Sequence, residues 1–235
     1  MRQWLYLVAL GALLLILGLQ WQQLQRLRSV EQDNTQRAES IFTYAIRRAD
    51  FQALPSALDR LAAAEGITET VERFKAAQTL AVAFTDDLLM LNDLRQAGPP
   101  IGHGLQYGDY RYSPATPEQE ALMWKIARGR PYAILWAMER KLYIDEGVMQ
   151  ESDRIALSDL TVQVRAISAT MDEVRAVVDS GYANMTSIAA GKMEELAAPL
   201  DALDQLGSRY EAGLPSLVPT PGSLYDRLYG PGTTP

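Results

Sequence analysis

The sequence predicts an all-α protein in which one N-terminal membrane-spanning helix precedes an elongated helical bundle with coiled-coil character. The first of three observations is an uncharged apolar run near the N-terminus. The second is that apolar residues recur every three or four positions along the rest of the chain, and the third is that no segment shows the alternating pattern of a β-strand. Within the 235 residues we expect an anchor over residues 1–22, a helical stalk over 23–50, an α-helical bundle over 51–212 and a flexible Pro/Gly-rich tail over 213–235.

The run from Trp4 to Leu19 contains no charged residue and predicts a membrane span. Its 16 residues would rise about 24 Å as a helix, slightly less than the ~30 Å hydrocarbon core of a bilayer. Aromatic residues lie near both ends of the run, as is usual at the headgroup boundary. A cleaved signal peptide and a buried core helix are the alternatives, but no pair of small residues suited to signal peptidase follows the run. The expected anchor residues are Trp4, Tyr6, Leu13, Leu17 and Trp21.

The charges around the run point in two directions for its orientation. Arg2 precedes the run and Arg26, Arg28 and Arg37 follow it, so the arginine count alone favours a cytoplasmic body. Long C-terminal domains cross membranes largely regardless of charge, however, and a chain without cysteine suits an oxidising compartment. We expect a single-pass protein of the inner (plasma) membrane with an extracytoplasmic, periplasmic body.

Helices punctuated by proline and glycine are expected after the anchor. The stalk should extend to about Arg48, and Leu54-Pro55-Ser56 should break the chain before a short helix that reaches Glu65. A long helix should then run from Thr68 or Thr70 to Gln96. Its apolar residues follow a heptad pattern typical of a bundle helix: Phe74, Ala77, Ala81, Phe84, Leu88 and Leu91.

Residues 97–116 form the only long irregular segment expected inside the bundle. Loops of this size in compact domains are often functional, and aromatic rings are enriched at protein interfaces. Tyr107, Tyr110 and Tyr112 are therefore candidates for partner binding, with a lid over the helical core as the alternative. His103 has no Asp, Glu or His close by in the sequence, and we expect it to be an ordinary loop residue.

Three further helices are expected, over 117–127, over 132–144 and from Ser152 onward. The last carries the clearest heptad pattern, which we expect to continue through Gly181 and Met185 to Ile188. Gly191 and Pro199 are expected to kink or segment the chain after that point. We interpret the pattern as an intramolecular core, with a seam against a second copy as the alternative. The candidate seam residues are Leu160, Val164, Ile167, Met171, Val174 and Val178.

The tail contains a short cluster of aromatic residues and leucine between stretches rich in proline and glycine. Tyr225, Leu228 and Tyr229 in this cluster are typical of a short docking peptide in a flexible tether. The alternative is an extended end whose apolar residues have no role.

Composition excludes several classes of function. The 29 acidic and 22 basic side chains give a net charge of −7, so nucleic acid is not an expected partner. The chain has no cysteine and one histidine, which excludes thiol catalysis, Fe–S clusters and sites that need two imidazoles. No phosphate-binding, dinucleotide-binding or hydrolase motif is present, and neighbouring acidic pairs such as Asp86-Asp87 suit a solvated helix face. We therefore expect no cofactor, no metal and no catalytic residues.

These observations together favour a non-enzymatic, membrane-anchored structural or adaptor component of a cell-envelope assembly. Its expected partners are the lipid bilayer, other envelope proteins and, as a further candidate, a second copy of the chain. One alternative is a sensory or ligand-binding bundle with a pocket lined by Trp124, Trp136 and the tyrosine loop. Another is a spanin-like phage lysis protein, which rests on the short basic N-terminus and the Gln/Arg-rich stalk.

Overall fold

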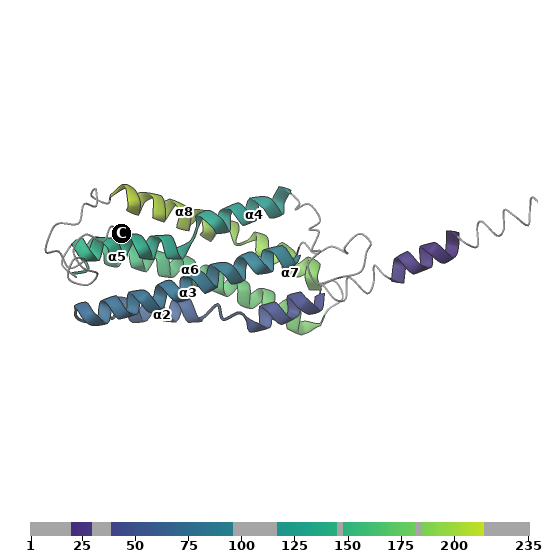
Figure 1. The fold of residues 1–235 in the computed structure, drawn as a ribbon, viewed down its shortest axis with the longest axis horizontal. Helices are drawn as coiled ribbons and strands as arrows, with labels where there is room; N and C mark the ends of the chain where they lie inside the picture. Colours follow the sequence, from purple (N-terminus) through teal and green to yellow (C-terminus); the bar gives the residue numbers. More distant parts are fainter. Residues whose placement is uncertain (1–19, 30–38, 96–116, 145–147, 182–184, 214–235) are drawn as a thin grey trace, which may run out of the picture. The chain divides into compact units, whose positions relative to one another are not determined.

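The computed structural model describes residues 20–29, 39–95, 117–144, 148–181 and 185–213. Every regular element in these residues is an α-helix, so the all-α prediction is confirmed (Figure 1). The chain divides into two units, Met1–Ile41 with Ala97–Pro114, and Phe42–Gln96 with Ala115–Pro235. In the first unit, residues 20–29 form a solvent-exposed helix. The second unit contains the helical bundle.

Two long helices without interruption organise the bundle, and shorter helices follow one another along them. The long helices are α3 (Ile67–Arg95) and α6 (Glu151–Ser180), each about 45 Å long. The shorter helices are α2 (Ala53–Ala62), which follows a helix over residues 39–48, α4 (Pro117–Arg128), α5 (Pro131–Ile144), α7 (Met185–Glu194) and α8 (Ala197–Ala212).

The helix pairs that pack against one another in the bundle form a closed ring. Helix α6 packs against α2 on one side and against α7 and α8 on the other. Helix α3 packs against α2, α4 and α5, and it also contacts α7. Helix α8 closes the ring because it packs against both α4 and α5. Each helix can therefore bury an apolar stripe toward a common interior.

Polar contacts fix the register of α6 against the segment from residue 42 to α2. Arg175 on α6 donates to the carbonyl oxygens of Ile46 at 3.2 Å and Ala49 at 2.5 Å, which lie where the helix over residues 39–48 ends. Carbonyls at a helix C-terminus lack intrahelical partners, so a guanidinium satisfies them well. Ser168 donates to the Phe51 carbonyl oxygen at 2.6 Å. The segment thus runs antiparallel to α6.

The core begins earlier in the chain than the predicted bundle boundary. Phe42, Ala45, Ile46 and Ala49 lie within residues 23–50, the predicted stalk, yet the structure buries all four among the core residues. Their spacing of three and four places them on one face, and a partner in α6 gives that stripe a place to pack. The end of the predicted stalk is therefore part of the bundle interior.

The heptad residues of α3 are buried as expected. Phe74, Ala77, Ala81, Phe84, Leu88 and Leu91 are each at most 3% exposed. The ring of Phe84 meets the ring of Phe51 edge to face, with centroids 5.5 Å apart, a favoured arrangement of aromatic quadrupoles. This contact joins α3 to the turn that precedes α2.

The prediction that the heptad pattern of α6 continues to Ile188 is wrong. Helix α6 ends at Ser180, and Gly181 adopts a left-handed conformation with φ of 67°. Glycine reaches this region without steric cost and commonly ends helices. Gly181 therefore ends α6 and does not continue its heptad pattern. A new helix, α7, begins at Met185, and the Ile188 side chain is 46% exposed.

The breaks expected at two prolines and one glycine do not occur at these residues. Pro55 lies in the first turn of α2 and Pro199 in the first turn of α8, where a missing backbone N–H removes no intrahelical bond. Gly191 lies inside α7. The interruption between α7 and α8 falls instead at residues 195–196.

Close backbone contact at Gly129 joins the turn between α4 and α5 to α8. A Cβ atom at this position would lie 2.6 Å from the Leu200 carbonyl oxygen, far inside van der Waals distance. At Gly191 in α7, by contrast, an added Cβ meets no atom within 4 Å. The two positions form a matched pair, since one glycine is required by packing and the other is not.

We predict that Gly129→Ala lowers the free energy of unfolding by about 1–3 kcal/mol, because α8 must shift to accept the methyl group. Gly191→Ala should raise it by about 0.5–1 kcal/mol, because alanine lowers the entropy cost of forming α7. Urea unfolding followed by circular dichroism measures both values. Equal effects of the two substitutions would contradict the close contact at Gly129.

Candidate functional site

Most residues predicted to contact lipid or partners lie outside the described part of the chain. They are Trp4, Tyr6, Leu13 and Leu17 in the apolar run, Tyr107, Tyr110 and Tyr112 in the segment 97–116, and Tyr225, Leu228 and Tyr229 in the tail. His103 lies outside it as well. Trp21 is described, and its side chain is 63% exposed on the helix over residues 20–29. Among the described helices, none combines the length and apolarity needed to span a membrane.

The predicted seam of α6 faces the interior of its own chain. Its six residues are all at most 3% exposed: Leu160, Val164, Ile167, Met171, Val174 and Val178. Helices α2, α7 and α8 cover most of α6, and α5 also contacts it. This surface is therefore occupied without a second copy.

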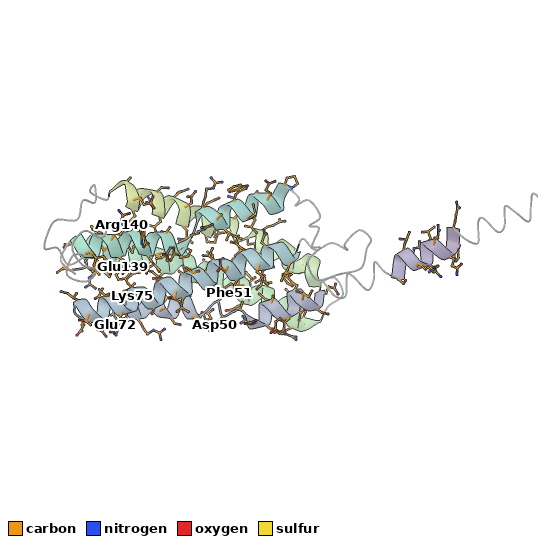
Figure 2. All side chains as sticks on the ribbon, viewed as in Figure 1. Asp50, Phe51, Glu72, Lys75, Glu139 and Arg140 are labelled. Carbon is orange, nitrogen blue, oxygen red and sulfur yellow. The ribbon has the colours of Figure 1, made fainter. Side chains whose placement is uncertain are left out.

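Glu139 is a buried carboxylate that joins α5 to α3. Its side chain is only 7% exposed. The Gln78 amide donates to Oε2 and the Tyr143 hydroxyl donates to Oε1, each at 2.6 Å. Figure 2 labels Glu139 and its neighbour Arg140 on α5. Hydrogen bonds to both oxygens satisfy a charge whose burial is otherwise costly.

Asp153 is a second buried carboxylate, and it joins three helices. Its Oδ1 accepts from Lys141 Nζ on α5 at 2.6 Å and from the Tyr210 hydroxyl on α8 at 2.7 Å. Its Oδ2 accepts from the Gln150 backbone N–H at 2.9 Å, which completes a capping box at the start of α6. Asp153 therefore holds α5 and α8 against the N-terminus of α6.

The arrangement of these polar groups suits the fastening of helices. Each of the two buried carboxylates is bound on both oxygens by neighbouring donors. Among the described residues, no three His, Cys, Asp or Glu side chains come together as a metal site would require. Lys192 extends the pattern at the surface, where hydrogen bonds to Glu173 and Glu195 raise its pKa.

Asp87 on α3 is the described carboxyl group with a raised pKa. Partial burial is the main cause, the charge of Asp86 raises the pKa further, and Arg48 offsets part of the change. The prediction of a solvated acidic pair thus holds for Asp86, which is exposed, but not for half-buried Asp87.

An exposed row of aromatic and arginine side chains follows α4 and α5. Tyr132 and Trp136 are the only exposed side chains among the described ones of α5, at 38% and 40%. Trp124 on α4 is 53% exposed. Several exposed aromatic rings on two consecutive helices suggest a contact outside the fold. We define the aromatic–arginine row by residues spaced four apart: Trp124, Arg128, Tyr132, Trp136 and Arg140.

The arginines of this row have no acidic partner among the described side chains. No carboxylate there lies within ion-pair distance of Arg128 or Arg140, or of Arg130 at the bend between the helices. The Arg140 guanidinium instead lies over the Trp136 ring, 4.5 Å from its centroid, as in a cation–π contact. The row is therefore a local positive strip on a chain of net charge −7.

Sequence reasoning missed this row, although it named Trp124 and Trp136 as pocket residues. The structure places both indoles on the outer surface of the bundle. The signal that could have revealed the row is its four-residue spacing, which continues across Gly129-Arg130-Pro131.

The chain matches no protein-family model, no curated protein and no solved structure.

We predict that Asp153→Asn lowers the free energy of unfolding by about 2–3 kcal/mol, since it leaves the largely buried Lys141 ammonium without its counter-charge. Tyr210→Phe should cost about 1 kcal/mol. The matched control is Asp201→Asn, which breaks the half-exposed pair with Lys125 and should cost less than about 1 kcal/mol. Urea unfolding of the three variants tests this order. A larger loss for Asp201→Asn would contradict the role given to Asp153.

The raised pKa of Asp87 predicts a pH-dependent gain from Asp87→Asn. A carboxyl whose pKa is higher in the folded state than its ordinary value of 3.8 destabilises the fold once it is ionised. The contribution is zero well below 3.8 and unfavourable above the folded-state pKa, so stability is lost as pH rises through this interval. Asp87→Asn should therefore raise the melting temperature at pH 7 and change it little at pH 3. Asp86→Asn should give a smaller gain, and equal gains at both pH values would refute the argument.

Proposed function

We propose that the protein is a single-pass, membrane-anchored and non-enzymatic structural or adaptor component of a cell-envelope assembly. In this proposal, the run from Trp4 to Leu19 holds the chain in the inner (plasma) membrane, and the bundle lies on the extracytoplasmic side. The bundle presents surfaces to lipid and to other envelope proteins. The observation that carries the proposal is this uncharged run ahead of a helical bundle whose buried carboxylates connect helices.

The chemistry of the bundle interior supports an adaptor. Glu139 and Asp153 are the buried carboxylates of the described residues, and each accepts hydrogen bonds on both oxygens. A general acid or base must instead reach a substrate proton. Asp153 also anchors Tyr210 near the end of α8, so the root of the C-terminal tail is attached to a rigid part of the bundle. Such a scaffold can hold docking segments at defined positions.

The surface of the bundle supports a role in binding. The aromatic–arginine row exposes residue types that are frequent at binding surfaces, and its arginines have no ion pairs among the described side chains. A homo-oligomer, if the chain forms one, would use a surface other than the α6 seam, because that seam is covered within the chain.

We predict that the body is reached from outside the cytoplasm, and cysteine labelling tests this directly. The chain has no native cysteine, and Ser208 is exposed on α8. Ser208→Cys in the full chain should react with a membrane-impermeant maleimide in unlysed cells. Any outer layer is first made permeable, while the inner membrane stays closed. Reaction only after lysis would place the body in the cytoplasm, as the arginine count favours, and would contradict the proposed location.

A buried position provides the control for that experiment. Ser168 is 1% exposed on α6, so Ser168→Cys should stay unlabelled in intact and in lysed cells until denaturant is added. Labelling of Ser168→Cys under native conditions would mean that the bundle is open, and the result at Ser208 would then say nothing about location.

A further inference from the structure

We propose that the aromatic–arginine row of α4 and α5 lies against the anionic phospholipid headgroups of the bilayer. The inference rests on the proposed function, because it requires that the chain be held at a membrane. It goes beyond it by assigning the surface of the bundle that faces the lipid and the class of lipid that this surface contacts.

The packing of the ring places the whole row on one side of the bundle. Helices α4 and α5 both pack against α3 and both pack against α8. They therefore occupy the same position in the ring, and the outward face of each lies opposite α3 and α8. Exposure agrees for four of the five residues, since Trp124, Arg128, Tyr132 and Trp136 are exposed, whereas Arg140 is half-buried and its Nε atom is covered. Trp124 on α4 and Trp136 on α5 are 12 positions apart in the sequence, with the bend at Gly129-Arg130 between the two helices.

The composition of the row fits a lipid headgroup layer, and tryptophan, tyrosine and arginine are also enriched at protein interfaces. Here each exposed ring has an arginine one helical turn away, Trp124 with Arg128 and Trp136 with Arg140. Tryptophan and tyrosine prefer the boundary between hydrocarbon and water, and arginine binds phosphate through paired N–H groups. Rings and guanidinium groups side by side therefore match a surface in which phosphates lie above acyl chains.

Charge determines which lipid is favoured and which side of the bundle turns toward it. Arg128, Arg130 and Arg140 have no carboxylate partner among the described side chains, a property that they share with other arginines such as Arg60 and Arg154. The rest of the chain is acidic enough to give a net charge of −7. An anionic membrane would repel the acidic surfaces and attract the row, so the bundle should adopt one orientation.

Because a short segment tethers the bundle to the membrane anchor, a weak contact is enough to keep the row against the lipid. Only 22 residues separate Leu19, the end of the apolar run, from Phe42, the first core residue. Even a fully extended segment of this length spans only about 75 Å. A bundle tethered this closely meets the membrane at an effective concentration of order millimolar. Two or three aromatic side chains and three arginines can then keep it docked.

Tryptophan fluorescence of the full chain tests the proposal. The chain has four tryptophans, and Trp4→Phe with Trp21→Phe leaves only Trp124 and Trp136. This variant is reconstituted into nanodiscs of phosphatidylcholine with 30% phosphatidylglycerol, in which the phosphatidylcholine carries bromine on its acyl chains. We expect quenching of about one third or more relative to unbrominated discs, and clearly less in pure phosphatidylcholine. No quenching in the anionic discs would overturn the proposal and leave a protein as the occupant of the row.

Charge variants show whether the arginines of the row cause the contact. Arg128→Gln with Arg130→Gln should lower the ratio of docked to undocked bundle about fivefold for each arginine removed. The matched control is Arg60→Gln with Arg154→Gln, which removes two exposed arginines from α2 and α6. Equal loss of quenching in the two double variants, or equal quenching in neutral and anionic discs, would overturn the assignment to anionic headgroups. Circular dichroism confirms that each variant keeps its helical content.

A third variant separates failure of this inference from failure of the proposed function. Trp21→Phe, Trp124→Phe and Trp136→Phe together leave Trp4 as the only fluorophore. Quenching of Trp4 by brominated lipid with unquenched Trp124 and Trp136 would keep the anchor and overturn the docking of the row. Unquenched Trp4 would overturn the anchor itself, and with it the premise of this inference.

Discussion

The apolar face of α6 is the constraint on which the rest of the bundle depends. Seven residues from Leu157 to Val178 point to one side of this helix, and all are almost fully buried. A stripe about 30 Å long cannot stay in water without a large free-energy cost, so other helices must cover it. In this chain the segment from Phe42 to α2 covers one flank, and α7 with α8 covers the other. Helix α3 then closes the ring through α2, α4 and α5.

Polar contacts give this apolar packing one register. Arg175 and Ser168 bind backbone carbonyls between Ile46 and Phe51, and Asp153 binds Lys141 and Tyr210. A helix displaced by one turn along α6 would leave these buried or half-buried groups without partners, at a cost of about 1–3 kcal/mol for each. The apolar stripes therefore determine that the helices associate, and the polar contacts determine where. Because the interior is satisfied in this way, the unpaired arginines and exposed rings of α4 and α5 are free to act outside the bundle.

The sequence was sufficient to predict what depends on local spacing. The stripes of α3 and α6 were predicted correctly because positions three and four apart share a helix face. Gly181 was misassigned because its position continues the heptad pattern, while its left-handed conformation depends on where α7 turns back. Pro55 and Pro199 were predicted to break helices because the sequence does not show that α2 and α8 begin only two residues before them. Proline is tolerated in the first turn of a helix. Glu139 and Asp153 were missed because Gln78 lies 61 residues from Glu139 and Tyr210 lies 57 residues from Asp153. The exposure of Trp124 and Trp136 was likewise invisible, since a tryptophan in a helix can face either side.

The central claim is that the α6 stripe is buried within one chain, and hydrogen exchange tests it most directly. The full chain in detergent is exchanged into deuterated buffer at two protein concentrations that differ tenfold, and peptides from residues 157–178 are followed by mass spectrometry. An intramolecular core requires that these amides be among the slowest in the described bundle and that their rates be the same at both concentrations. Faster exchange of these peptides at the lower concentration would mean that a second copy covers α6, and would contradict the account.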